Sequence, residues 1–156
     1  MKRELHIQRF IRDHIAWESL LAEKPYCISV LRDVMFGRKL MILKYSQIDS
    51  NFHDPIVCEC RGLILDEETL EPVTVPFFKF GNYGESYCPN IDWSSAYCLQ
   101  KVDGSLIKIV RLDNDLLIST NGTIDAFKAP VADQLGCKYK SFGDIGRKCL
   151  QAKALA

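Results

Sequence analysis

At 156 residues, the chain is long enough for one domain with a substantial hydrophobic core and too short for two comfortable ones. Its 47% hydrophobic and 26% charged residues are ordinary for a soluble globular protein, and the 20 basic residues balance the 20 acidic ones. No global positive field therefore indicates nucleic acid or an anionic membrane as a partner, although a local cleft can still be basic. No stretch approaches the roughly 20 apolar residues of a membrane-spanning helix, and the charged N-terminus lacks the apolar core of a secretory signal. We expect a cytoplasmic protein without a membrane partner.

The N-terminal part of the chain predicts one helix followed by two strands. Apolar residues recur at spacings of roughly three to five across residues 2–22, which predicts a helix that ends before Pro25. Residues 27–31 and 39–45 are rich in strand-forming side chains, and Gly37 marks the turn between them.

The middle of the chain predicts further strands. The sequence PIVCECRGLILD, residues 55–66, favours one buried strand. The sequence PVTVPFFKF, residues 72–80, favours a strand at a sheet edge because prolines bound it, and GNYGES follows as a loop. Residues 96–101, 106–111 and 116–120 predict three more strands, of which the last two are joined by LDND as a hairpin turn.

Residues 125–135 and 141–152 predict two helices, the first of them interrupted by Pro130. The whole pattern is typical of an α+β fold, in which an antiparallel sheet is flanked by helices. We expect a single domain, residues 1–156, with its N-terminal helix in 1–24, its sheet in 27–122 and helices in 125–156. Because no strand follows the last helix to close the sheet, we expect this domain to be truncated.

The sequence KVDGS, residues 101–105, suits covalent catalysis by a lysine. A lysine amine attacks phosphorus only when it is unprotonated, which needs a pKa lowered by apolar surroundings and nearby cations. Gly104 lets the backbone turn tightly, and Asp103 can hold the hydration shell of a Mg²⁺ ion. The alternative is an exposed hairpin with a solvated Lys101. In the catalytic interpretation, the apolar walls come from Leu99, Leu106 and Ile107.

Two further motifs precede KVDGS in a fixed order. They are ECRGLILD, residues 59–66, and VPFFKFGNYGE, residues 75–85. The ordered set resembles the ATP-dependent RNA ligases of the phage tRNA-repair type, members of the lysine nucleotidyltransferase superfamily, over roughly half of the chain. The resemblance implies the N-terminal part of a nucleotidyltransferase domain. Its cofactors would be ATP and Mg²⁺, and its partners would be RNA ends, with tRNA as one candidate.

The resemblance also implies roles for individual residues. Lys101 would become adenylated by ATP, and the AMP would then activate an RNA 5′-phosphate for sealing to a 3′-hydroxyl. Arg61 and Lys79 would contact the phosphates or the adenylate. Asp103 and Gly104 would belong to the nucleotide site, with Asp103 reaching the metal through water. Asn121 stands where some members carry a basic residue; it can bind a ribose or a phosphate, or it can simply form an Asn-Gly turn.

Other interpretations of these residues stay open. Arg61 can pair with Glu59 or Asp66, and Lys79 can be a solvent-facing strand residue. At the level of function, DNA ligases and mRNA-capping guanylyltransferases share the K-x-D-G element, and GTP competition separates the capping type. A non-catalytic fragment that binds nucleotide or RNA is a third reading, because elements implied by the resemblance, such as a metal-binding glutamate and a paired-lysine strand, have no counterpart after residue 125.

The remaining reactive residues favour structural roles. Cys58-x-Cys60 would place two side chains on one strand face, and the seven cysteines lack metal-site spacing, so we expect small buried thiols in a reducing cytosol. The three histidines have no serine or cysteine partner for hydrolysis and are expected at the surface or at helix caps. The phenylalanines of the FFKF sequence are expected in the core more than in base stacking; they are Phe77, Phe78 and Phe80.

Overall fold

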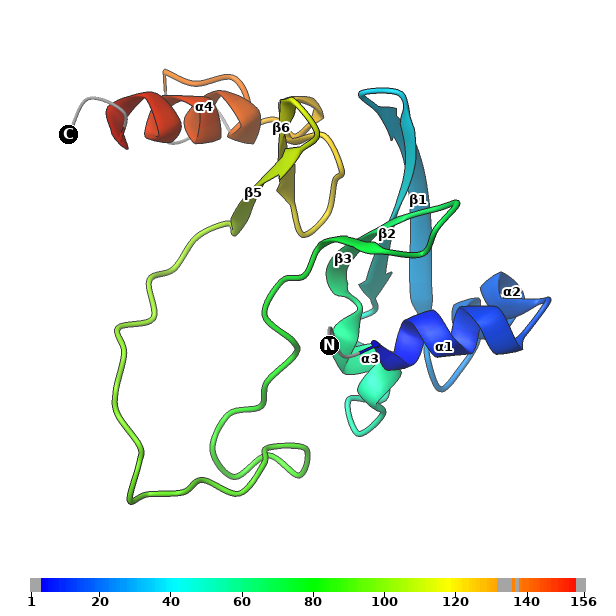
Figure 1. The fold of residues 1–156 in the computed structure, drawn as a ribbon. Coiled ribbons are helices and arrows are strands. Elements are labelled where there is room, and N and C mark those ends of the chain that lie inside the picture. The colour runs from blue at the N-terminus through cyan, green and yellow to red at the C-terminus, as the bar shows by residue number, and fades with distance from the viewer. Residues whose placement is uncertain (1–3, 132–135, 137, 154–156) are drawn as a thin grey trace.

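A computed structural model describes residues 4–131, 136 and 138–153, and its ribbon is drawn in Figure 1. The described chain contains helices, a four-stranded antiparallel sheet and a separate two-stranded antiparallel sheet. The predicted α+β class is therefore confirmed, whereas the expectation of one continuous sheet is wrong. Within the described residues, no helix is both long enough and apolar enough to cross a bilayer.

The two middle strands of the four-stranded sheet are buried on both faces, whereas the first strand is largely exposed on its outer edge. Side chains alternate across a strand, so Met41 and Leu43 belong to one apolar cluster while Leu40 and Ile42 belong to another. This double burial explains the unbroken apolar run in the second strand. The strands, in their spatial order, are β1 (Ile28–Met35), β2 (Arg38–Tyr45), β3 (Arg61–Asp66) and β4 (Pro72–Thr74).

The N-terminal segment forms two helices, α1 (His6–Asp13) and α2 (Trp17–Ala22), and not the single helix expected over residues 2–22. Helix α1 ends at Asp13, and the next residue, His14, is extended, with its Nδ1 2.9 Å from the Phe10 carbonyl oxygen. The break lets the two helices pack in different directions. Helix α1 contacts the short helix that precedes β3, whereas α2 contacts β1 and buries Leu21.

Residues 55–66 are not one strand. Helix α3 (Pro55–Glu59) comes first, and β3 begins two residues later at Arg61. The side chain of Asp54 accepts a hydrogen bond from the Ile56 amide at 2.8 Å, and Pro55 stands at the start of the helix, where its missing N–H costs nothing. The two cysteines therefore lie in and after a helix, and the expected shared strand face is wrong.

The β5–β6 hairpin covers the second face of the large sheet. Its strands are β5 (Ile107–Leu112) and β6 (Asp115–Thr120), and they confirm the two strands predicted there and the turn between them. Leu112 and Leu117 complete the cluster around Leu40 and Ile42. The hairpin thus rests on the sheet through side chains and shares no ladder with it.

The C-terminal region keeps only one of its two expected helices. Helix α4 (Phe142–Lys153) matches the prediction for residues 141–152. The helix expected over residues 125–135 is wrong in its first half, because only the single 3-10 turn η1 (Ala126–Lys128) forms there. Pro130 then pairs with Ser141 in an isolated β-bridge, and residues 132–135 lie outside the described chain.

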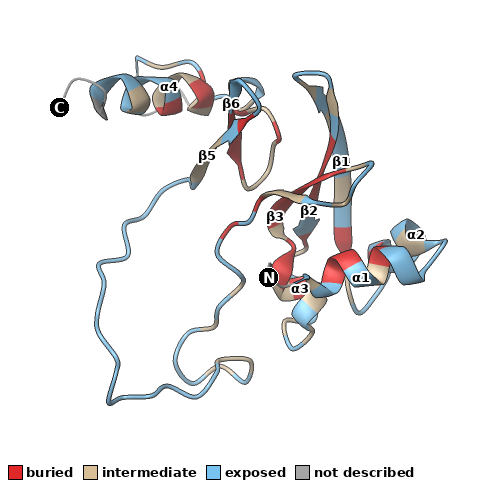
Figure 2. Ribbon diagram, in the orientation of Figure 1, coloured by how far each residue is buried: buried red, intermediate tan, exposed pale blue. Residues whose placement is uncertain are grey.

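Residues 75–106 leave the sheet and form a long open segment between β4 and β5, seen as the wide green loop of Figure 1 and mostly exposed in Figure 2. Strand β4 stops at Thr74, and Pro76 has no N–H to continue a ladder. The strands predicted for the rest of residues 72–80 and for 96–101 are therefore wrong: these residues find no partner strand among the described ones.

Candidate functional site

Three of the residues singled out from the sequence line one cavity of about 320 Å³: Arg61, Lys79 and Lys101. They come from the start of β3, from the segment after β4 and from the far part of the open segment. The volume falls in the range of about 300–1,000 Å³ that is typical of small-molecule sites. The remaining lining residues are Tyr45, Gln47, Phe52, Phe80, Asn82 and Tyr87.

Helix α3 and strand β3 position Arg61 at the cavity. The carbonyl of the buried Cys60 accepts the Tyr45 amide at 2.9 Å, which fixes the turn from helix to strand. The Arg61 guanidinium lies 5.0 Å from the centre of the Phe80 ring. Burial raises the pKa of the Tyr45 phenol, and the Arg61 charge and hydrogen bond offset part of that effect. Arg61 thus faces aromatic rings at the edge of the core.

The ion pairs considered for Arg61 do not form. Glu59 is buried and accepts the backbone amides of His6 and Ile7, at 3.1 and 3.0 Å, together with the His6 ring at 2.8 Å. Asp66 pairs with Arg38 at 2.8 Å. Both carboxylates are therefore occupied elsewhere, and the Arg61 charge is directed at the cavity without an acidic partner among the described residues.

Lys79 lies against the aromatic floor of the cavity, which is formed by Tyr45, Phe52 and Tyr87. Its amide donates to the Cys58 carbonyl at 2.9 Å, which ties the open segment to α3. Its ammonium lies 4.9 Å from the Phe52 ring and 5.1 Å from the Tyr87 ring, distances that suit cation–π attraction. Lys79 is half-buried and outside any strand, so the interpretation as a solvent-facing strand residue is wrong.

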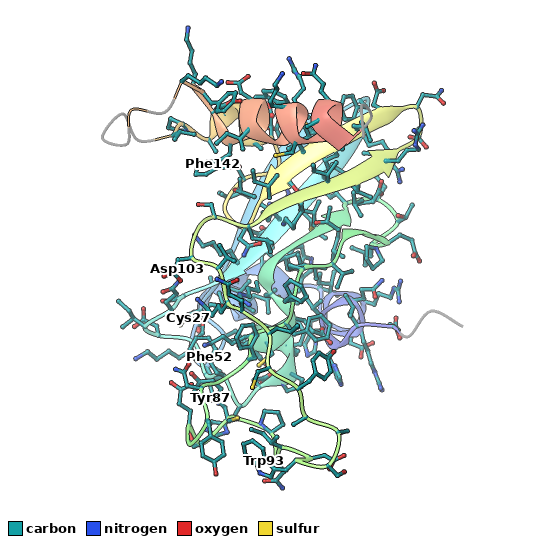
Figure 3. The ribbon with its side chains drawn as sticks, turned by 90° about the vertical axis from the view of Figure 1, so that its left-hand side faces the viewer. Cys27, Phe52, Tyr87, Trp93, Asp103 and Phe142 are labelled. Carbon is teal, nitrogen blue, oxygen red and sulfur yellow. The ribbon has the colours of Figure 1, made fainter. Side chains whose placement is uncertain are left out.

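The sequence motifs did not predict the aromatic floor. Tyr45, Phe52 and Tyr87 are in contact, with ring centres 5.1 and 5.4 Å apart along the series, and the last two are labelled in Figure 3. A hydrogen bond from its hydroxyl to Glu85 raises the pKa of Tyr87 to about 12. Tyr87 stands far from Tyr45 and Phe52 in the sequence, so only the folded chain brings the three rings together.

Lys101 lies at the open rim of the cavity. Its side chain is 75% exposed, and its ammonium is 3.2 Å from Asp103 Oδ1. The expected apolar walls are not formed, because Leu99 is 78% exposed and the segment is no strand. Gly104 has a φ of +145°, a conformation that favours glycine, and the chain bends there without a hydrogen-bonded turn among the described residues.

The Asn121–Gly122 turn lies at a second cavity of about 250 Å³, which Gly104 and Ser105 also line. The turn is closed by Thr120, whose hydroxyl accepts the amides of Gly122 and Thr123 at 3.1 Å each. The structure therefore groups Asn121 with Gly104 and places Arg61, Lys79 and Lys101 around the neighbouring cavity. The KVDGS segment contributes to both.

A larger cavity of about 420 Å³ lies between α1 and β4 and contains none of the predicted residues. Two carboxylates, Glu4 and Glu71, and the guanidinium of Arg12 line it, and Arg12 is paired with Glu4. This charge balance does not favour an anionic ligand. The cationic cavity at Lys101 suits phosphate better.

The described residues contain no cluster of three or more acidic, histidine or cysteine side chains that could hold a metal by themselves. A Mg²⁺ ion usually needs only one or two carboxylates, since phosphate oxygens and water fill the remaining positions. Asp103, whose side chain is 98% exposed beside Lys101, fits that minimal role. The expectation of buried thiols holds for Cys60, whereas Cys98 and Cys149 are exposed.

The phenylalanines of the FFKF sequence are not core residues, which corrects the expectation. Phe77 is 73% exposed, and Phe78 and Phe80 are about half exposed. Histidines fit the expected cap roles at α1: His14 contacts a carbonyl at its end and His6 contacts Glu59 at its start.

The chain matches no protein-family model. A protein of Autographa californica nuclear polyhedrosis virus, named as a bifunctional polynucleotide kinase/RNA ligase, is 34% identical over 105 residues. The match covers 60% of this chain and 15% of that protein, so the chain spans a small part of its relative's length. The match supports a relationship to an RNA-ligase-like protein. The phage tRNA-repair type has no such support and stays a prediction.

Proposed function

We propose that this chain belongs to an ATP-dependent RNA ligase that forms a covalent lysyl-AMP intermediate on Lys101. The observation that carries the proposal is the convergence of Arg61, Lys79 and Lys101 on one cavity, although they are far apart in the sequence. The relative's name, which includes an RNA ligase, supports the ligase part of the proposal. RNA 5′-phosphate and 3′-hydroxyl ends would be the partners.

The first step is nucleotidyl transfer. The Lys101 amine, after losing a proton to solvent, attacks the α-phosphorus of ATP; a P–N bond forms, the P–O bond to the β-phosphate breaks, and pyrophosphate leaves. Catalysis of this kind rests on positioning and charge neutralisation. Arg61 can hold two phosphate oxygens at once, whereas Lys79 acts as a point charge. Mg²⁺ would supply further charge neutralisation, with Asp103 binding its water shell.

The cavity also offers a place for a nucleoside. Phe52, Tyr87 and Phe80 present aromatic faces beside the two cations. A base stacked on such faces is worth about 1–3 kcal/mol. Gly104 and Asn121, on the far side of the KVDGS segment, would contact the outgoing phosphate or the ribose. In the two later steps, AMP passes to an RNA 5′-phosphate and a 3′-hydroxyl then displaces it.

The test is covalent labelling with ATP that carries a radioactive α-phosphate, in the presence of Mg²⁺, followed by denaturation. We expect label on the wild-type chain, no label on Lys101→Ala, and full label on Lys148→Ala, which removes an exposed lysine of α4. Competition with unlabelled GTP separates a ligase from a capping enzyme. Retained label on Lys101→Ala, or a folded wild-type chain without label, would contradict the proposal.

A further inference from the structure

Lys108 is a cation on the inner face of the β5–β6 hairpin. Strand alternation places it on the same face as Val110 and Leu112, which pack in the cluster between hairpin and sheet. Burial alone lowers the pKa of Lys108 to about 8. Its ammonium donates to the Gly62 carbonyl and has no acidic partner among the described residues. An ammonium has three protons, so two of its donors remain without a recorded partner.

The acceptor of Lys108 lies against the Asn121–Gly122 turn. A Cβ built on Gly62 would lie 2.6 Å from the Asn121 carbonyl oxygen, so the two backbones are in direct contact. Ser119 is the cross-strand partner of Lys108 and is fully buried. The Ser119 hydroxyl and the Asn121 side-chain oxygen are both buried without a hydrogen-bond partner in the structure. Buried polar atoms without a partner are rare. The Ser119 hydroxyl can donate to an acceptor such as a phosphate oxygen, whereas the Asn121 oxygen only accepts and needs a donor such as an ammonium group.

A second cation approaches the same turn from the large sheet. The Lys44 ammonium lies 3.9 Å from the position that a Cβ on Gly122 would take. Lys44 is also the cross-strand partner of Arg61, and it is exposed. Neither Lys44 nor Lys108 forms an ion pair within the described residues. In contrast, Lys39 pairs with Glu68 and Lys128 pairs with Asp33.

We propose that Lys44 and Lys108, with the Asn121–Gly122 turn between them, form a phosphate-binding subsite. Two ammonium groups with free donors beside the half-buried Asn121–Gly122 turn suit a phosphate, which offers several acceptor oxygens and negative charge. A bound phosphate would offset the cost of holding the Lys108 charge in partly apolar surroundings. The unpartnered Ser119 hydroxyl can donate a hydrogen bond to the same phosphate.

The subsite lies next to the proposed nucleotide cavity, on the side of Gly62. Arg61 lines that cavity, and Gly62 beside it accepts the Lys108 hydrogen bond. The phosphate could belong to a nucleic-acid strand that enters toward Lys101 or to the triphosphate of ATP. Lys44 and Lys108 provide positive charge from neighbouring strands beside Asn121, which has none of its own.

The test is equilibrium binding of a fluorescent single-stranded RNA with a 5′-phosphate, measured by anisotropy at several salt concentrations. Lys108→Met and Lys44→Met remove each charge while keeping most of the side-chain volume. Lys39→Met is the matched control, because it removes a paired lysine from the other end of β2. A parallel titration with ATP in place of RNA identifies the source of the phosphate. Circular dichroism shows whether each variant is folded.

We expect each of the two subsite variants to weaken RNA binding roughly tenfold and to reduce the salt slope by about 0.7. The control should match the wild type. If only ATP binding weakens, the subsite holds the triphosphate. The proposal would be overturned if folded Lys44→Met bound RNA as tightly as the control variant does and also bound ATP as tightly as the control variant does. Lys44 is exposed, so this variant decides the matter even where Lys108→Met fails to fold.

The subsite rests on the proposed function only for the choice of ligand, and the two can fail separately. Binding does not require the Lys101 amine to react. A wild-type chain that takes no label from ATP, yet binds RNA through Lys108 and Lys44, would exclude the covalent step and leave the subsite standing. If the wild-type chain is labelled at Lys101 but Lys44→Met binds RNA and ATP as tightly as the wild type, the covalent step stands and the subsite is excluded.

Discussion

Gly62 shows how a single residue connects the sequence motif to the packing of the two sheets. It is the glycine of ECRG, with a φ of +86°, and its missing side chain lets the Asn121 backbone approach. Gly84 has a similar φ of +90° but lies in open space. Gly62 is therefore required both by its positive φ and by the close approach of Asn121, whereas Gly84 is favoured by its positive φ alone.

This difference gives a prediction about stability. Gly84→Ala should cost about 1 kcal/mol of unfolding free energy, because only backbone strain is added. Gly62→Ala should cost at least about 2 kcal/mol more, since its Cβ would clash with backbone atoms that cannot move independently. Urea denaturation followed by circular dichroism measures both. Equal costs at the two positions would mean that the hairpin does not press on β3 as described.

Lys108 was detectable in principle from its position in the strand. In the sequence IKIVRL, Arg111 marks one face as polar, so Lys108 shares the opposite face with Val110 and Leu112. A lysine on an inward face is unusual and signals a function or a specific partner. What the alternation could not show is its acceptor, because Gly62 lies on a strand of the other sheet.

At the scale of elements, the segment around α3 shows why local pattern was insufficient. The apolar run in residues 55–66 is equally compatible with a buried helix and a buried strand, and periodicity cannot separate short runs of this kind. Asp54 and Pro55 form a helix-start signal that outweighs the strand propensity of the next residues. The consequence reaches the site, because the end of this helix sets the position of Arg61.

The turn after β3 gives an element-scale prediction about pH. Burial raises the pKa of Asp66, but hydrogen bonds from the Thr69 amide and hydroxyl and from Arg38 outweigh it, so the net pKa is lowered. A lowered folded-state pKa stabilises the protein above the unfolded value of about 3.9, and this contribution is lost as the pH falls through the folded value.

Asp66→Asn should therefore lower the unfolding free energy by about 1.5–3 kcal/mol at neutral pH, where charged hydrogen bonds are lost. The difference from wild type should be smaller at about pH 3, because the unfolded-state carboxylate is then mostly protonated and the charged hydrogen bonds favour the folded state less. Urea midpoints at both pH values measure the effect. Asp115→Asn, which changes an exposed carboxylate of β6, serves as the control and should show little difference at either pH. If Asp66→Asn lowered the unfolding free energy equally at both pH values, the loss would come from the changed shape of the side chain and not from its charge.

On the scale of the whole molecule, stable packing and the candidate site are divided between different parts of the chain. The helices, the two sheets and the apolar clusters between them hold residues 4–74 and 107–131 together. Residues 75–106 cross between these parts with little burial (Figure 2), yet they supply Lys79 and Lys101. The proposed chemistry therefore depends on a segment with few stabilising contacts.

Limited proteolysis tests this division. Chymotrypsin should cut first near Trp93 and Tyr97, which are 69% and 80% exposed, because a protease needs an extended and accessible backbone. Tyr45, which is buried in β2, should resist under the same conditions. Mass spectrometry of the first fragments identifies the sites. Early cleavage within β1–β3, with residues 89–103 intact, would show that the open segment is protected in solution.

The sequence by itself determined the α+β class, the first two strands, the β5–β6 hairpin and the last helix, because each depends on local periodicity and turn residues. The ordered motifs also identified three of the residues that line the cavity, Arg61, Lys79 and Lys101. The tertiary structure decided which strands pair, where α3 replaces a strand, how the aromatic floor forms and which group accepts the hydrogen bond from Lys108. Those features depend on contacts between distant segments, and local propensity carries no information about a partner that lies far away in the chain.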